Sequence, residues 1–98
     1  MLVNIIKGHR NIVAICDSDL IGKKFEQGKF QLDLTGNFFK GDEMSEKETI
    51  QIMQNMKKED ATFNIVGQKS INIAIKTKII SQKGIKKIQD VPFALVLL

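Results

Sequence analysis

The sequence has little of several residue types that build well-known sites. Its 98 residues include one cysteine, one histidine and one proline, and neither tryptophan nor tyrosine. A single cysteine forms no internal disulfide, so nothing here indicates an oxidising compartment. One cysteine and one histidine also fall short of the ligands of a tetrahedral zinc site. We therefore expect neither a metal nor another cofactor.

Long apolar runs are missing as well. No apolar stretch approaches the ~20 residues that cross a bilayer. The first residues, MLVNIIKGH, place charge after the apolar stretch, which is the reverse of a secretory signal. The apolar fraction of 43% and the charged fraction of 27% are typical of a globular protein. We expect one domain, residues 1–98, in the cytoplasm.

Acidic residues are scarce in the last part of the chain. Residues 61–98 contain six lysines and one acidic residue, Asp90, so this part carries a formal charge of +5, whereas the whole chain carries +4. Residues 42–60, with three basic and six acidic residues, carry −3. This asymmetry favours a polyanionic partner such as nucleic acid. A lysine-rich solvated surface explains the same pattern without a partner, so both interpretations stay open.

Local patterns predict five strands and three helices. β-rich or alternating runs predict strands at 2–6, 11–16, 29–34, 61–66 and 93–98. Ser45 and Glu48 have the spacing of a capping box that starts a helix ending near Lys58. A second helix is expected from Gln68 to about residue 78. A third, short one would be capped by Ser81 and ended by Pro92.

The resulting order, β-β-β-α-β-α-α-β, predicts an α+β domain. An antiparallel β-meander would form its N-terminal part, and the later helices would pack on one face of the sheet.

The stretch AICDSDLIGKKF, residues 14–25, has the residue types of several kinds of site. A P-loop needs an earlier glycine and a Ser or Thr after Gly-Lys, but Lys24 follows Gly22-Lys23. A calcium loop needs oxygen ligands where Ile21 and Gly28 stand. The residue types therefore match neither site.

Cys16 in this stretch leaves two interpretations. A catalytic thiol needs a lowered pKa and a base, and His9 or Asp17 would have to assist it. The alternative is a small buried side chain at the end of a strand. Asp17 would then begin a turn or cap a helix, while the apolar residues that follow it pack inward.

A second candidate is NIVGQKS, residues 64–70. A strand that ends at Gly67 and runs into a helix exposes free N–H groups, to which phosphate can bind beside Gln68, Lys69 and Ser70. Lys69, Lys76 and Lys83 recur every seven residues, and Lys86-Lys87 follow. These lysines predict either a basic ridge or an ordinary solvated helix face.

Phe38 and Phe39 are the third candidate. Adjacent residues of an extended chain point in opposite directions, so one ring is available to stack on a base or a partner. Alternatively, one ring packs under the following helix.

Several of these segments, in this order and spacing, resemble a family of small archaeal proteins known as domain-of-unknown-function family four-two-four. The similar segments are Cys16-Asp17, Leu20-Ile21-Gly22-Lys23 with Phe25 and Gly28, Phe38-Phe39-Lys40-Gly41, Asn64-Ile65-Val66-Gly67 and Val91-Pro92. They cover nearly the whole chain. The resemblance implies a cytosolic archaeal protein of unsettled function, with translation or RNA processing suggested by analogy.

Three positions depart from the family pattern. Phe93 follows Val-Pro where the family has histidine, which argues against a histidine-dependent activity. Lys78 stands where the family places a helix-ending glycine, so the C-cap of this helix is expected to be less stable. Ser81-Gln82-Lys83 replaces a commonly acidic segment, so a basic ridge there would be particular to this chain.

Three functional hypotheses follow. The leading one is a non-enzymatic module that contacts RNA or a ribonucleoprotein, with Phe38 or Phe39 stacking on a base. Its phosphate-contact candidates are Lys23, Lys24, Lys40, Gly67, Gln68, Lys69, Lys76, Lys83, Lys86 and Lys87. The alternative is a protein–protein adaptor that uses the aromatic pair or the C-terminal strand as an edge. The third is a small cysteine-dependent enzyme.

Overall fold

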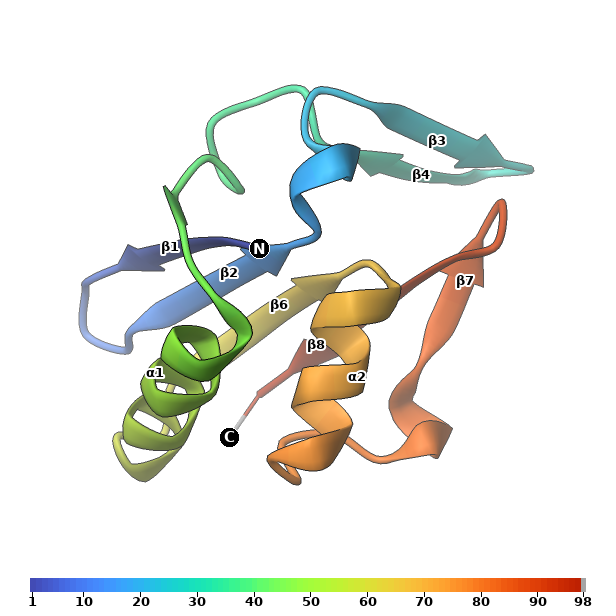
Figure 1. The fold of residues 1–98 in the computed structure, drawn as a ribbon. Coiled ribbons are helices and arrows are strands. Elements are labelled where there is room, and N and C mark those ends of the chain that lie inside the picture. The colour runs from blue at the N-terminus through green and yellow to red at the C-terminus, as the bar shows by residue number, and fades with distance from the viewer. Residues whose placement is uncertain (98) are drawn as a thin grey trace.

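The computed structural model describes residues 1–97 and has a mixed α+β fold (Figure 1). A six-stranded sheet has the order β5-β1-β2-β6-β8-β7, and a separate hairpin consists of β3 and β4. The strands are β1 (Leu2–Ile6), β2 (Ile12–Cys16), β3 (Lys24–Gln27), β4 (Phe30–Asp33), β5 (Asp42–Glu43), β6 (Thr62–Val66), β7 (Lys86–Ile88) and β8 (Val91–Val96). The helices are α1 (Glu46–Lys58) and α2 (Gln68–Lys76), and η1 (Ser18–Leu20) and η2 (Gln82–Gly84) are 3₁₀ turns.

Strands β2 and β6 run parallel, and the other paired strands run antiparallel. Figure 1 shows α1 and α2 on one face of the sheet, away from the β3–β4 hairpin. The predicted α+β class, with antiparallel N-terminal strands and helices on one face, is confirmed. No helix within residues 1–97 has the length and apolar composition needed to cross a membrane.

The helix-covered face forms the larger core. Alternate residues of a strand point to the same side, so Val13 and Ile15 of β2 join Phe63 and Ile65 of β6 beneath the helices. Helix α1 begins at the predicted capping box. Ser45 Oγ accepts from the backbone N–H of Glu48, and a Glu48 carboxylate oxygen accepts from the N–H of Ser45, both at 3.1 Å.

The opposite face of the sheet is covered in part by residues 17–41, which include the β3–β4 hairpin. Strand β4 lies within the predicted strand 29–34, whereas β3 was not predicted. Ala14, Cys16 and Val66 pack against Leu34 and Phe39, with the β3–β4 hairpin above them. The apolar residues after Asp17, namely Leu20, Ile21 and Phe25, pack partly buried against this second cluster as expected.

The predicted third helix is wrong. Ser81 makes no side-chain cap, and the chain forms η2 and then strand β7. Gln89 and Asp90 have φ of 49° and 65°, so they form a two-residue turn that returns the chain as β8. Pro92 therefore lies inside β8 instead of ending a helix, just before the residues that pair with β6.

Two boundaries also differ from the predictions. Strand β8 begins at Val91 and ends at Val96, while Leu98 of the predicted strand lies outside the described residues. Helix α2 ends at Lys76, and Lys78 adopts φ of 62°. The N–H groups of Lys78 and Ile79 donate to the carbonyls of Ile75 and Ala74, the pattern of a Schellman motif. Lys78 thus takes the left-handed conformation that glycine adopts without strain.

Candidate functional site

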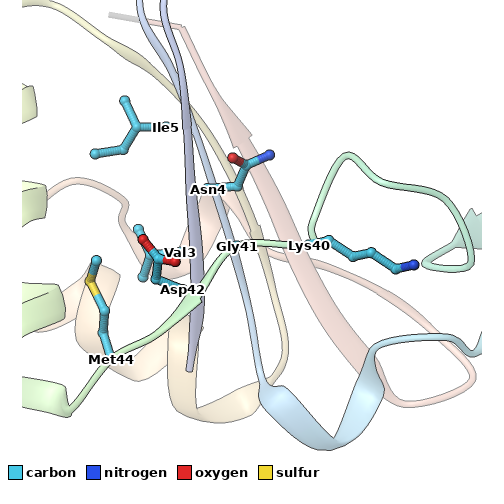
Figure 2. A pocket seen from close by; sticks show the side chains of 7 residues that line it. All are labelled: Val3, Asn4, Ile5, Lys40, Gly41, Asp42 and Met44. Carbon is cyan, nitrogen blue, oxygen red and sulfur yellow. The ribbon is translucent and has the colours of Figure 1, made fainter.

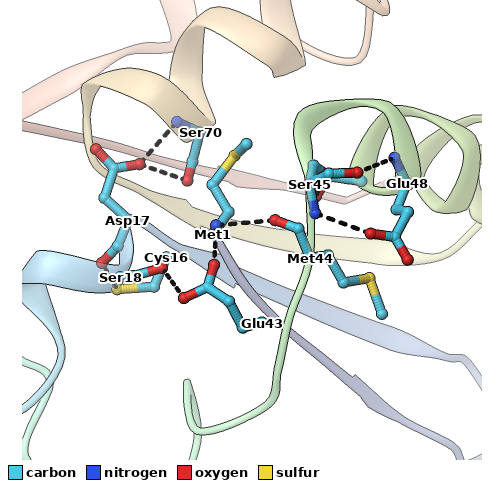
Figure 3. A network of polar contacts seen from close by, with 10 residues as sticks. Met1, Cys16, Asp17, Ser18, Glu43, Met44, Ser45, Glu48 and Ser70 are labelled. Carbon is cyan, nitrogen blue, oxygen red and sulfur yellow. Dashed lines mark hydrogen bonds and ion pairs between the residues drawn. The ribbon is translucent and has the colours of Figure 1, made fainter.

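The two parallel strands end side by side, and polar groups meet there. Asp17 follows β2, and Gly67 joins β6 to α2. The buried Asp17 carboxylate accepts from the backbone N–H of Ser70 at 2.8 Å, its hydroxyl at 2.7 Å and the N–H of Lys69 at 3.1 Å. Figure 3 shows Asp17 facing Ser70. Asp17 therefore caps α2, a helix that begins 51 positions later in the sequence.

The Asp17 carboxylate leaves no room for a side chain at position 67. The φ of Gly67 is +106°, and a Cβ on it would lie 2.3 Å from Cγ of Asp17. Its own N–H donates to the carbonyl of Pro92 at 2.8 Å. Of the two backbone donors predicted to bind phosphate, Gly67 and Gln68, the N–H of Gly67 is therefore already used. The N–H groups of Lys69 and Ser70, which follow in the same helix start, are used by Asp17.

Further carboxylates surround this end of the sheet. Exposed Asp19 lies in η1, and Glu43 of β5 accepts from Ser18 Oγ at 2.6 Å. Hydrogen bonds from the N-terminal amine and Ser18 lower the pKa of Glu43 from its usual value. A phosphate would meet acidic side chains here.

The cysteine hypothesis is wrong for two reasons. Cys16 is fully buried, and desolvation together with Asp17 and Asp19 raises the pKa of its thiol to about 12. His9 lies in the turn between β1 and β2, whereas Cys16 pairs with Leu2 at the far end of the hairpin. Four strand residues separate Cys16 from that turn, about 13 Å. Asp17, the other partner considered, is occupied by Ser70 and Lys69.

No set of three or more His, Cys, Asp or Glu side chains within residues 1–97 is placed to hold a metal ion.

One ring of the aromatic pair is exposed and the other is buried, as predicted, but both residues lie in a turn and the buried ring packs elsewhere. Phe39 is buried against the face of the sheet opposite the helices, so packing under the following helix is wrong. Phe38 is 41% exposed and meets Phe39 edge to face, with ring centroids 5.1 Å apart. The side-chain amide of Asn4 donates to the carbonyl of Phe38 at 2.8 Å, which places this residue beside β1.

Lys40 lies in the same region. A cavity of 420 Å³ is lined by Lys40, Gly41, Asp42, Met44 and residues of β1. Figure 2 shows that the Lys40 side chain points away from Met44. A Cβ on Gly41 would lie 2.1 Å from the carbonyl oxygen of Val3, so this glycine lets the loop pass close to β1.

The remaining family-motif residues, Gly22, Asn64 and Pro92, lie in turns or strands of the scaffold. The N–H of Gly22 donates to the carbonyl of Leu34 at 2.7 Å, which joins η1 to the end of β4. Half-buried Asn64 lies on β6 between Ala14 and Leu95, on the face away from the helices. Pro92 is buried in β8.

The predicted basic ridge is not one helix face. Nζ of Lys76 lies 3.2 Å from Oε1 of Glu46 in α1. Lys69 and Glu46 both line a cavity of 480 Å³. Lys24 pairs with Glu26 at 3.4 Å, and Lys23 is exposed in the turn before β3. These lysines are separated from the later ones, and several of them have a carboxylate nearby.

Three of the candidate lysines do come together. We call η2 and β7, with Lys83, Lys86 and Lys87, the β7 edge. Consecutive strand residues point to opposite faces, so Lys87 faces α2 while Lys86 faces the β3–β4 hairpin. Lys83 stands next to Gln82, which lines the cavity that Lys87 enters.

The cavity on the α2 side of β7 is polar and free of acids. This α2–β7 groove has a volume of 340 Å³ and is lined by Gln68, Ile71, Asn72, Ile75, Gln82, Ile85, Lys87 and Pro92. The amide of Gln68 donates to the side-chain oxygen of Asn72 at 2.8 Å. Three side-chain amides and one ammonium group therefore border the same groove.

The cavity on the other side of β7 contains an aromatic ring that sequence reasoning missed. This hairpin-tip cavity, 140 Å³, is lined by Gln27, Phe30, Lys86, Lys87, Ile88 and Phe93. In the predicted strand 29–34, Phe30 alternates in step with Leu32 and Leu34, yet Phe30 is 71% exposed. The signal that could have revealed it is the Gly28-Lys29 turn before it, since Phe30 pairs with Gln27 at the outer end of the hairpin.

The structure does not bring the predicted stacking pair to the β7 edge. Phe38 lies beside β1, and β2, β6 and β8 separate β1 from β7. Strands in a sheet are ~4.8 Å apart, so the two places are about 19 Å from each other.

Comparison with known proteins gives a family and a fold. A family model described as "Protein of unknown function (DUF424)" matches residues 6–98, which confirms the family inferred from the sequence motifs. The crystal structure of an uncharacterized conserved protein from Methanopyrus kandleri is similar over 98% of this chain and 90% of that one. Its TM-score is 0.84 at 19% sequence identity, so the likeness shows a shared fold. No curated protein matches the chain.

Proposed function

The chain belongs to the family of proteins of unknown function DUF424, and we propose that it is a non-enzymatic, cytoplasmic module that binds RNA through the β7 edge. Contact with a ribonucleoprotein through its RNA is included in this proposal. The lysines supply charge, and the α2–β7 groove supplies amides that can hydrogen-bond to phosphate, sugar or base.

One observation carries the proposal. Lysines line both cavities beside β7, and no carboxylate lines either of them. In contrast, three other surface cavities each include Asp42 or Glu46. A phosphate backbone that enters either cavity beside β7 would therefore meet lysine and no lining carboxylate, whereas in those three cavities it would also meet Asp42 or Glu46.

The experiment is a salt titration of RNA binding. Fluorescence anisotropy would follow a labelled RNA that contains both a stem and an unpaired loop, from low to moderate salt. If Lys83, Lys86 and Lys87 each neutralise one phosphate, the slope of log K against log salt is about −2.1 to −2.7. Affinity then falls about 20- to 40-fold between 50 and 200 mM salt.

A matched pair of triple variants separates a site from net charge. Lys83→Gln, Lys86→Gln and Lys87→Gln together remove the proposed contacts. Lys40→Gln, Lys47→Gln and Lys58→Gln remove the same charge elsewhere, so each triple variant lowers the formal net charge from +4 to +1. We expect the first set to abolish the salt-dependent binding and the second to keep most of it. Absence of binding at low salt, or equal losses in both sets, would contradict the proposal.

A second candidate function, a protein–protein adaptor, is favoured by the edge of β8. Strand β7 pairs with β8 only as far as Phe93, so within residues 1–97 the outer edge of Ala94–Val96 has no partner strand. Leu95 and Leu97 are 59% and 70% exposed. Such an edge accepts an added strand from a partner. If the immobilised wild-type chain captures a protein partner from nuclease-treated extract, Leu95→Lys should abolish that capture. Unchanged capture by Leu95→Lys would count against this edge.

A further inference from the structure

The exposed ring at the hairpin tip has a defined position. The turn between β7 and β8 holds the hairpin, because the backbone N–H of Gln89 donates to the side chain of Gln27 at 2.9 Å. The amide of Gln89 also donates to the carbonyl of Glu26 at 2.7 Å. Phe30 pairs with Gln27 across the hairpin, so these bonds also fix where the Phe30 backbone stands.

The surroundings of this ring combine two kinds of chemistry. Phe30, Ile88 and Phe93 provide apolar walls, while Gln27 provides an amide and Lys86, on the hairpin side of β7, provides an ammonium group. An exposed aromatic face bordered by a lysine matches a nucleotide, whose flat base stacks on the ring while its phosphate meets the cation.

We propose that the hairpin-tip cavity binds an unpaired nucleotide of RNA, whose base stacks on Phe30 and whose flanking phosphate contacts Lys86. This inference rests on the proposed function and names the part of the RNA that is recognised. Bases inside a duplex are already stacked on both faces, so a base in a loop, bulge or single strand is the one that reaches Phe30.

A tryptophan at this position gives a direct readout. The chain has neither tryptophan nor tyrosine, so Phe30→Trp introduces a single reporter that keeps a stacking surface. We expect its fluorescence to be quenched by a short single-stranded RNA and much less by the same sequence in a blunt duplex. Phe38→Trp, at the distant partly exposed phenylalanine, is the matched control and should not respond.

The affinity test uses Phe30→Ala. Loss of one base stack weakens binding of the single strand about 5- to 160-fold. The salt slope should stay unchanged because no charge is lost, and the affinity for the duplex should also stay unchanged. Phe38→Ala should leave every value as in the wild type. Urea unfolding of each variant verifies that the fold is intact.

The outcomes separate this inference from the proposed function. If salt-dependent RNA binding persists while Phe30→Ala has no effect and Phe30→Trp shows no quenching, the stacking site is refuted and the RNA-binding function stands. If no RNA binds at low salt, both are refuted. If a leucine- and aspartate-rich peptide quenches Phe30→Trp and RNA does not, the cavity is a protein-docking site and the nucleotide proposal is wrong.

Discussion

Replacement of the buried Asp17 by alanine should lower the free energy of unfolding more than most other single substitutions in the loops. Ser70 is fully buried, and both its N–H and its hydroxyl donate to the Asp17 carboxylate. Hydrogen bonds to a charged acceptor contribute about 1.5 kcal/mol or more each, so these two account for about 3 kcal/mol. The N–H of Lys69 adds a third, partly buried bond, and its contribution is offset by the desolvation of the carboxylate itself.

Such a loss is easy to measure by urea unfolding followed by circular dichroism. With a denaturant slope of about 1–3 kcal/mol per molar, the unfolding midpoint should fall by about 1–3 M for Asp17→Ala. The melting temperature should fall by about 12–24 °C, since each kcal/mol shifts a domain of this size by about 4–8 °C.

Two further variants define what the carboxylate does. Asp17→Asn keeps an oxygen that accepts from Ser70 but turns an NH₂ group toward the N–H of Lys69, so an intermediate loss of about 1–2 kcal/mol is expected. Asp19→Ala removes a nearby exposed carboxylate and should change stability by less than about 0.5 kcal/mol. If Asp17→Ala destabilises the protein no more than Asp19→Ala does, the capping role of Asp17 is refuted.

Three other predictions concern single residues. Lys78→Gly should stabilise the protein by about 0.5–1 kcal/mol in thermal unfolding, because Lys78 has φ of 62°; a loss of stability would contradict the strain. The Cys16 thiol, whose pKa is raised by burial to about 12, should resist a disulfide reagent until the protein unfolds. Its contribution to stability is complete below pH 9.0 and is lost as the pH rises from there through about 12. Ser45→Ala should cost about 1 kcal/mol. The backbone N–H of Ser45 lowers the pKa of Glu48, so the stabilisation from this pair is present above the usual glutamate pKa and is lost as the pH falls through the lowered value. A helix content that does not decrease on acidification would contradict this assignment.

The features that sequence reasoning predicted correctly depend on neighbours in the chain. The capping box joins Ser45 and Glu48, which are three residues apart, so local sequence is enough to reveal the start of α1. The unfavourable end of α2 at Lys78 was expected from the resemblance, because the family places glycine there and glycine adopts a left-handed conformation freely.

The features that were missed depend on distant or unusual contacts. Strand β7 was predicted as helix, because Ile85 and Ile88 have helical spacing and the Gln89-Asp90 turn contains no glycine to reveal it. Asp17 bonds to an amide 52 residues away, which no local pattern shows. Lys86 and Lys87 were found from charge alone, but Phe30 was not, because its exposure depends on where the hairpin ends relative to the sheet.

The two motifs that first suggested the family, Cys16-Asp17 and Asn64-Ile65-Val66-Gly67, are one structural unit, and their energies should be coupled. In the wild type, Gly67→Ala brings a Cβ to 2.3 Å from Cγ of Asp17 and also imposes a side chain on φ of +106°. In an Asp17→Gly background the carboxylate is gone, so only the backbone strain of about 1–2 kcal/mol remains. The two substitutions should therefore be less than additive by about 1–3 kcal/mol in urea unfolding. Gly22→Ala is the control, since Gly22 has φ of +84° but no atom within 4 Å of a Cβ, and it should add to Asp17→Gly within about 0.5 kcal/mol. Equal coupling for Gly67 and Gly22 would show that the close approach of Asp17 is not what requires glycine at position 67.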